Sequence, residues 1–126
     1  MNPPEKLFGS ITPLITPFRD GLVDYDLYGK LVDRHIDQGG HGVFVNGTTS
    51  EPSLLSIAER NQLVDVAVAV ARGRGTVIAA TGSQSLAETH ALSDHATKSG
   101  VDALLIVTPY YVRPGCGAMV QRFSEG

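Results

Sequence analysis

One cysteine and no tryptophan occur among the 126 residues, and basic residues are few and scattered. A single thiol, Cys116, cannot form an internal disulfide, which favours a reducing compartment. No run approaches the ~20 apolar residues of a membrane span, and the start lacks the layout of a secretory signal. With a net charge of −3 and no basic cluster, nucleic-acid binding has little support. The composition predicts a soluble, cytoplasmic globular domain.

Short apolar runs recur at intervals of roughly thirty residues, the length of one strand–helix unit. Each run is rich in β-branched residues and flanked by Gly, Thr or Pro, as buried strands are. The runs are Ile11–Ile15, Val43–Val45, Thr76–Ala80 and Ala103–Val107. Their near-continuous apolarity favours a parallel sheet that is covered on both faces.

Helical patterns lie between these runs. A buried helix face is predicted from Leu27 to Ile36, with Asp24 placed to cap its start. Ser56 with Glu59, and Ser85 with Glu88, both match the capping box, in which the serine accepts from a backbone N–H and the glutamate reaches back. Two further helices are therefore expected to begin at these serines.

An internal repeat links the two halves of the chain. His35, Gly40 and Thr48 recur as His95, Gly100 and Thr108. In each copy a helix ends, glycine permits a left-handed cap, and a strand runs to threonine. The repeat predicts an α/β fold: the amino-terminal half, about four βα units, of a TIM (β/α)8 barrel, or else an open doubly wound sheet. We expect residues 1–126 to form one partial barrel, truncated in or near its fourth helix.

Polar side chains gather where two of the predicted strands end. Gly47, Thr48 and Thr49 follow the second strand, and Tyr110 and Tyr111 follow the fourth. Carboxyl ends of parallel strands share one edge of a sheet. Threonine hydroxyls and backbone N–H groups can hold a small carboxylate, and a tyrosine bonded to a threonine can relay a proton. The alternative, that the threonines start a helix and the tyrosines only pack, stays open on residue types alone.

The lysines are poorly placed for carbonyl chemistry. Lys6 lies in the leading arm, Lys30 falls off the apolar stripe of the first helix, and Lys98 sits in a last helical turn. None ends a strand or lies in an apolar pocket that would lower its pKa for attack on a carbonyl.

Four segments together resemble the dihydrodipicolinate synthase/N-acetylneuraminate lyase superfamily. They are Gly9–Ile11 with Thr16-Pro17, Gly47–Glu51, Ala80–Gly82 and Val107–Tyr111, in the family's order and spacing between about Leu7 and Arg113. The resemblance implies a (β/α)8 barrel and a class I lyase that binds pyruvate as a Schiff base on a lysine. For the dihydrodipicolinate synthases, which the Thr-Thr pair favours, the second substrate is aspartate semialdehyde and the pathway is lysine biosynthesis.

The same resemblance implies roles for individual residues. Thr49 and the Gly47 backbone would bind the pyruvate carboxylate, and Thr48 and Tyr111 would be catalytic members of a proton relay. Tyr111 would reach into a neighbouring subunit, which implies a homo-oligomer, a dimer or tetramer. The Schiff-base lysine and a third relay tyrosine belong to later strands and have no counterpart here. No cofactor, metal, membrane or nucleic acid is implied.

We therefore expect a chain that carries part of a pyruvate site and is inactive alone. One alternative is a non-catalytic half-barrel that associates through its open strand edges. Another is a related 2-oxo acid aldolase that acts on a different aldehyde. Ser50 replaces the family's glycine, and Ile57 and Arg60 stand where lysine-inhibited synthases have histidines, which puts inhibition by lysine in doubt.

Overall fold

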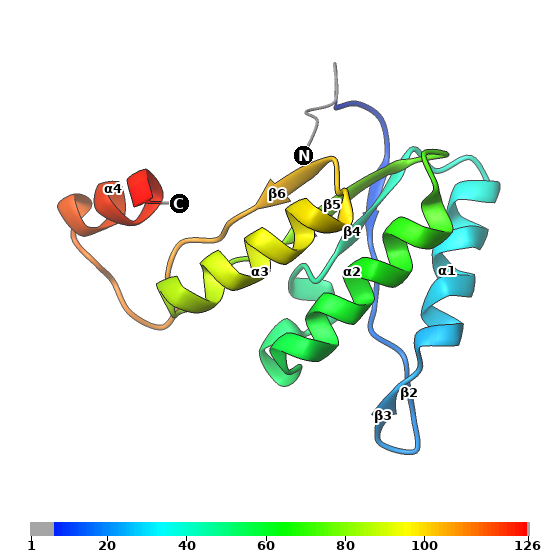
Figure 1. Cartoon of the computed structure of the whole chain (residues 1–126), viewed down its shortest axis with the longest axis horizontal. Coiled ribbons are helices and arrows are strands. Elements are labelled where there is room, and N and C mark those ends of the chain that lie inside the picture. The colour runs from blue at the N-terminus through cyan, green and yellow to red at the C-terminus, as the bar shows by residue number, and fades with distance from the viewer. Residues whose placement is uncertain (1–6, 126) are drawn as a thin grey trace.

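The computed structural model describes residues 7–125, and its centre is one parallel four-stranded sheet (Figure 1). The strands, in spatial order, are β1 (Ile11–Pro13), β4 (Gly42–Val45), β5 (Thr76–Ala80) and β6 (Ala103–Leu105). Spatial order thus follows chain order, whereas a doubly wound sheet reverses its order at a switch point. Of the two predicted architectures, the half-barrel is the one observed.

Three helices cover one face of this sheet (Figure 1): α1 (Tyr25–Asp37), α2 (Ile57–Ala71) and α3 (Leu86–Ser99). The register sets Val43 beside Val77 and Val45 beside Ala79, and all four are buried in a core shared with the helices. Residues of the opposite parity face the other way, and among them Leu105 is 47% exposed. The prediction of a sheet covered on both faces is therefore wrong for residues 7–125, because only the helices supply a cover.

The predicted helix starts are observed with one correction. Asp24 accepts from the Leu27 N–H at 3.0 Å, and Ser56 and Glu59 form a complete capping box. Ser85 does accept from the Glu88 N–H, at 3.3 Å. The Glu88 carboxylate, however, accepts from the Ser83 hydroxyl at 2.6 Å. The second box is not reciprocal, since a short hydroxyl–carboxylate bond has replaced the backbone bond.

The repeat has the predicted left-handed glycine at Gly100, but in the first copy the left-handed residue is Gly39 and not the predicted Gly40. Gly39 after α1 and Gly100 after α3 adopt nearly equal left-handed φ values of 96° and 95°. In both copies the chain then enters a strand of the sheet, β4 or β6. The left-handed conformation is costly for a residue with a Cβ atom, so glycine ends both helices, although at positions that differ by one residue between the copies.

A hairpin after the first strand was not predicted, whereas the fourth helix was. A hairpin of β2 (Phe18–Arg19) and β3 (Leu22–Val23) turns at Asp20-Gly21, where both residues have positive φ, 52° and 78°. An Asp-Gly pair is a strong signal for such a turn. The helix α4 (Cys116–Glu125) lies at one end of the molecule, apart from the other helices (Figure 1). Between residues 7 and 125, no helix combines the length and apolarity that crossing a membrane requires.

Candidate functional site

The turn Gly47–Glu51 leaves the carboxyl end of β4, as predicted. It contains a short 3-10 helix, Thr48–Ser50, closed by a bond from the Ser50 N–H to the Gly47 carbonyl at 2.9 Å. Gly47 is buried, and a Cβ atom there would lie 2.6 Å from Cε1 of Phe44, so any other residue would require the Phe44 ring to move. Both threonine side chains of the turn are exposed and open to a ligand.

Contacts from neighbouring elements fix this turn. Ser50 is 1% exposed, and its hydroxyl donates to the Leu14 carbonyl. The Thr16 hydroxyl donates to the Ser50 carbonyl at 2.8 Å. The Asn46 side chain donates to the Arg60 carbonyl at 3.0 Å and so links the turn to α2. Two of the motif segments recognised in the sequence, around Thr16 and around Ser50, therefore meet in space.

Arg60 joins α2 to the carboxyl end of β5. Its side chain donates from Nη2 to the Ala80 carbonyl at 2.9 Å and from Nη1 and Nη2 to the Gly82 carbonyl at 3.4 Å. The residue is 7% exposed and forms no ion pair with any other residue between 7 and 125. Burial lowers the pKa of the guanidinium, while the charges of Tyr110 and Glu88 act in the opposite direction. An arginine stays protonated despite such a shift, so a buried positive charge lies near this edge of the sheet.

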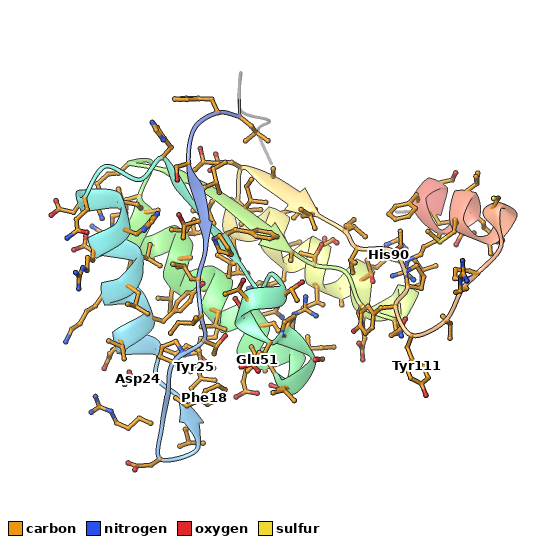
Figure 2. The ribbon with its side chains drawn as sticks, turned by 180° about the vertical axis from the view of Figure 1, so that it is seen from behind. Phe18, Asp24, Tyr25, Glu51, His90 and Tyr111 are labelled. Carbon is orange, nitrogen blue, oxygen red and sulfur yellow. The ribbon has the colours of Figure 1, made fainter. Side chains whose placement is uncertain are left out.

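The two tyrosines follow β6 in a longer loop. Tyr110 is 45% exposed, whereas the Tyr111 side chain is fully exposed on a backbone with φ of 72°. Figure 2 shows Tyr111 pointing away from the body of the molecule and far from Glu51. No hydrogen bond joins Tyr111 to Thr48 in the part of the chain that the structure describes. Within one chain, the two predicted relay residues are therefore not brought together.

Sequence reasoning missed Gln84, which lies in the loop between β5 and α3. Its Oε1 accepts from the Tyr110 N–H at 3.0 Å, and its Nε2 donates to the Tyr110 carbonyl. Arg122 of α4, also missed, donates to the Ser83 carbonyl and to the Gln84 carbonyl at 3.4 Å. Gln84 is 26 residues from Tyr110, so no local pattern signals the pair. The one available sign was its position next to the Ala80–Gly82 segment.

The described lysines offer no nucleophile at this edge. Lys30 is exposed on α1, and Lys98 on α3 donates to Asp94 at 2.9 Å. This hydrogen bond raises the pKa of Lys98, the direction opposite to what attack on a carbonyl requires. Lys6 lies outside the described residues.

Other kinds of site find little support near the threonines. No group of three His, Cys, Asp or Glu residues within 7–125 could hold a metal ion. A cavity of about 670 Å³ lies between the β2–β3 hairpin and the start of α1, lined by residues that include Arg19, Leu22 and Lys30. Neither threonine borders it. The Gly47–Glu51 turn therefore lies outside this cavity, and its two threonine side chains are exposed on the surface. We call this turn the cradle.

Known proteins with the same arrangement are dihydrodipicolinate synthases. The 4-hydroxy-tetrahydrodipicolinate synthases of Methylobacterium radiotolerans and Aquifex aeolicus are 42% and 41% identical to this chain over 119 and 116 residues. The crystal structure of the Aquifex aeolicus synthase superposes with a TM-score of 0.89 at 40% identity, over 93% of this chain. A chloride-inhibited synthase from Acinetobacter baumannii, crystallised with pyruvate, superposes with a TM-score of 0.88 at 40% identity, also over 93% of this chain.

These relatives are longer proteins. The two sequence matches include 94% and 92% of this chain but only 40% of each relative. The chain also covers 40% of each of the two superposed structures. The model of the dihydrodipicolinate synthetase family matches residues 6–125, nearly the whole of the present sequence. The chain therefore belongs to the dihydrodipicolinate synthetase family and corresponds to the amino-terminal half of its barrel.

Proposed function

We propose that this chain supplies the pyruvate-binding cradle of a Schiff-base lyase of the dihydrodipicolinate synthase type. The observation that carries the proposal is the Gly47–Glu51 turn. Hydrogen bonds from Ser50 to Leu14 and from Thr16 to Ser50 fix the turn, while its two threonine side chains stay exposed. In this proposal the Thr49 hydroxyl and the backbone N–H groups near Gly47 bind the pyruvate carboxylate. The pyruvate bound by the Acinetobacter baumannii relative shows that a protein of this fold takes this ligand.

The reaction requires an amine that residues 7–125 do not place at the site. A lysine would attack the carbonyl carbon of pyruvate, and loss of water would give an imine. Loss of a proton from the methyl group would then give an enamine that adds to an aldehyde, aspartate semialdehyde in the synthases. Because Lys30 is exposed on α1 and Lys98 is paired with Asp94, we propose that residues 1–126 bind but do not turn over pyruvate.

Tyr111 fits the proposal through its exposure. A fully exposed tyrosine that makes no contact with Thr48 can serve a relay only if another chain or segment brings the two sites together. We propose that Tyr111 completes the relay of a neighbouring subunit in a homo-oligomer, while Thr48 acts within its own chain.

Borohydride trapping tests the missing amine. Borohydride delivers hydride to the imine carbon and converts the imine into a stable secondary amine that mass spectrometry detects. With pyruvate and borohydride, the 126-residue chain is expected to show no adduct, and the full-length Aquifex aeolicus relative is the positive control. A pyruvyl adduct on Lys30 or Lys98 would contradict the proposal.

A chimera tests the cradle itself. Residues 1–126 joined to the remaining portion of the Aquifex aeolicus relative are expected to form the adduct, because the fusion supplies the later strands. Thr49→Val removes the carboxylate-binding hydroxyl with little change of shape and is expected to weaken pyruvate binding roughly tenfold. Thr97→Val on α3 is the matched control. Equal affinity for pyruvate in the Thr49 and Thr97 variants would contradict the carboxylate-binding role of Thr49.

A second candidate function rests on a different observation. The sheet face opposite the helices has no cover in residues 7–125: Leu105 of β6 is 47% exposed, and Ile15, two residues beyond β1, is 58% exposed. The edge strands β1 and β6 each pair on one side only. Such a face and such edges favour association, so the chain could act as a non-catalytic half-barrel module. Failure of the chimera to form an adduct would favour this second function.

A further inference from the structure

We infer that Gln84 is a positioning residue that holds Tyr111 in its outward conformation. The inference deepens the proposed function and rests on it for the part in which Tyr111 acts as a proton relay. It draws on three independent features: the backbone of Tyr111, the double hydrogen bond to Tyr110, and the arginine contacts that hold Gln84.

The backbone of Tyr111 needs an external restraint. Its φ of 72° lies in the left-handed region, which a residue with a Cβ atom avoids. Its side chain is fully exposed, so packing does not maintain the conformation. Residues kept in such regions persist only where their surroundings determine them, and these positions cluster at functional sites.

Gln84 provides that restraint at the preceding residue. Its carboxamide accepts from the N–H of Tyr110 at 3.0 Å and donates to the carbonyl of Tyr110. The side chain thus pairs with both backbone polar groups of one residue, much as a strand partner would. Because the carbonyl of Tyr110 belongs to the peptide group that enters Tyr111, fixing it limits φ at Tyr111.

We call the two hydrogen bonds between Gln84 and Tyr110 the clamp. Two arginines hold the loop that carries Gln84. Arg122 of α4 binds the carbonyls of Ser83 and Gln84, and Arg60 of α2 binds those of Ala80 and Gly82. Three of the five carbonyls in the β5–α3 loop, residues 81–85, therefore accept from a guanidinium. Hydrogen bonds from charged donors are stronger than neutral ones, which makes this loop a firm base for the Gln84 side chain.

Amide hydrogen exchange in the 126-residue chain tests the clamp. In Gln84→Ala the Tyr110 N–H loses its acceptor, so its exchange is expected to accelerate roughly three- to tenfold, and the φ-dependent couplings of Tyr111 are expected to average. Gln84→Glu keeps the acceptor but loses the donor, so it is expected to protect the N–H while still freeing Tyr111. Gln62→Ala changes an exposed glutamine with no side-chain hydrogen bond to residues 7–125 and is the control.

The outcomes separate the clamp from the proposed function. Wild-type exchange at Tyr110 and unchanged couplings at Tyr111 in Gln84→Ala would overturn the clamp, whatever the chain catalyses. In the chimera, Gln84→Ala is expected to lower kcat roughly tenfold with the KM for pyruvate unchanged, because a displaced relay slows chemistry but not binding. If Tyr111→Phe leaves kcat unchanged there, the relay role fails while the clamp stands as a structural device.

Discussion

The Gly47–Glu51 turn and the Tyr110–Tyr111 loop belong to the same edge of the sheet, yet the chain holds them in different ways. The turn is tied through Leu14 and Thr16 to the segment that follows β1, and through Asn46 to α2. The tyrosine loop depends on one glutamine side chain and leaves Tyr111 fully exposed. The turn lies against the body of the molecule, whereas Tyr111 projects from it (Figure 2).

The difference indicates which functions each region can serve. A carboxylate cradle gains from rigidity, because preorganised donors lose little entropy when the ligand binds. A residue that serves a neighbouring chain must instead project beyond its own fold. The comparison predicts that substitutions around the turn change stability strongly, whereas substitutions in the tyrosine loop change it little.

Among substitutions at this edge of the sheet, replacing Arg60 is expected to have the largest effect. Arg60→Met keeps the buried stem but leaves the carbonyls of Ala80 and Gly82 without their donor, so the free energy of unfolding should fall by about 3 kcal/mol. Urea unfolding followed by circular dichroism measures the change. Arg60→Lys keeps the charge but not the fork, and an intermediate loss is expected. Arg34→Met, at an exposed position of α1, is the control, and equal losses in the two Met variants would break the comparison.

Replacing Ser50 is expected to have a smaller effect. Ser50→Ala leaves the Leu14 carbonyl buried without its donor and should lower the free energy of unfolding by about 1–2 kcal/mol. Amide exchange at Thr48 and Thr49 should accelerate in parallel. Ser53→Ala changes an exposed serine three residues further on and should leave both quantities near wild type. If Ser50→Ala kept wild-type stability and wild-type amide exchange at Thr48 and Thr49, the bond from Ser50 to Leu14 would not be what fixes the turn.

Replacing Tyr111 is expected to have the smallest effect. Since its side chain is fully exposed, Tyr111→Ala should change the free energy of unfolding by no more than about 0.5 kcal/mol. Tyr28, which is 1% exposed in the core, supplies the contrast, because Tyr28→Ala should cost about 4 kcal/mol. A large loss of stability in Tyr111→Ala would show that the tyrosine packs within its own chain and would remove the distinction between the two regions.

Much of the fold could be predicted because its signals are local. The run Thr76–Ala80 is a strand with the predicted bounds, and Ser56 caps α2 together with Glu59 as its spacing indicates. The left-handed cap at Gly100 was predicted because such a cap needs glycine, but in the first copy the cap is at Gly39 and not at the predicted Gly40. The Asp20-Gly21 turn carried an equally local signal, but the predicted strands and helices did not include it.

The candidate site was predictable in position but not in detail. The ends of β4 and β6 follow from the strands, so the shared edge of Gly47–Thr49 and Tyr110–Tyr111 could be inferred. That Ser50 would donate to Leu14 could not, since the two are 36 residues apart and meet only through the pairing of β1 with β4. The assigned roles of Thr48, Thr49 and Tyr111 remain proposals.

The sequence by itself determined the strands, the helix caps and the family, because apolar runs, capping residues and short motifs act over a few neighbouring residues. Only the tertiary structure determined which hydrogen-bond partners the polar side chains have. Glu88 bonded to Ser83 instead of closing its capping box, Arg60 became buried against β5, and Gln84 clamped Tyr110. Each choice depends on how helices and strands come together, since a hydrogen bond forms only where packing brings a donor within reach of an acceptor.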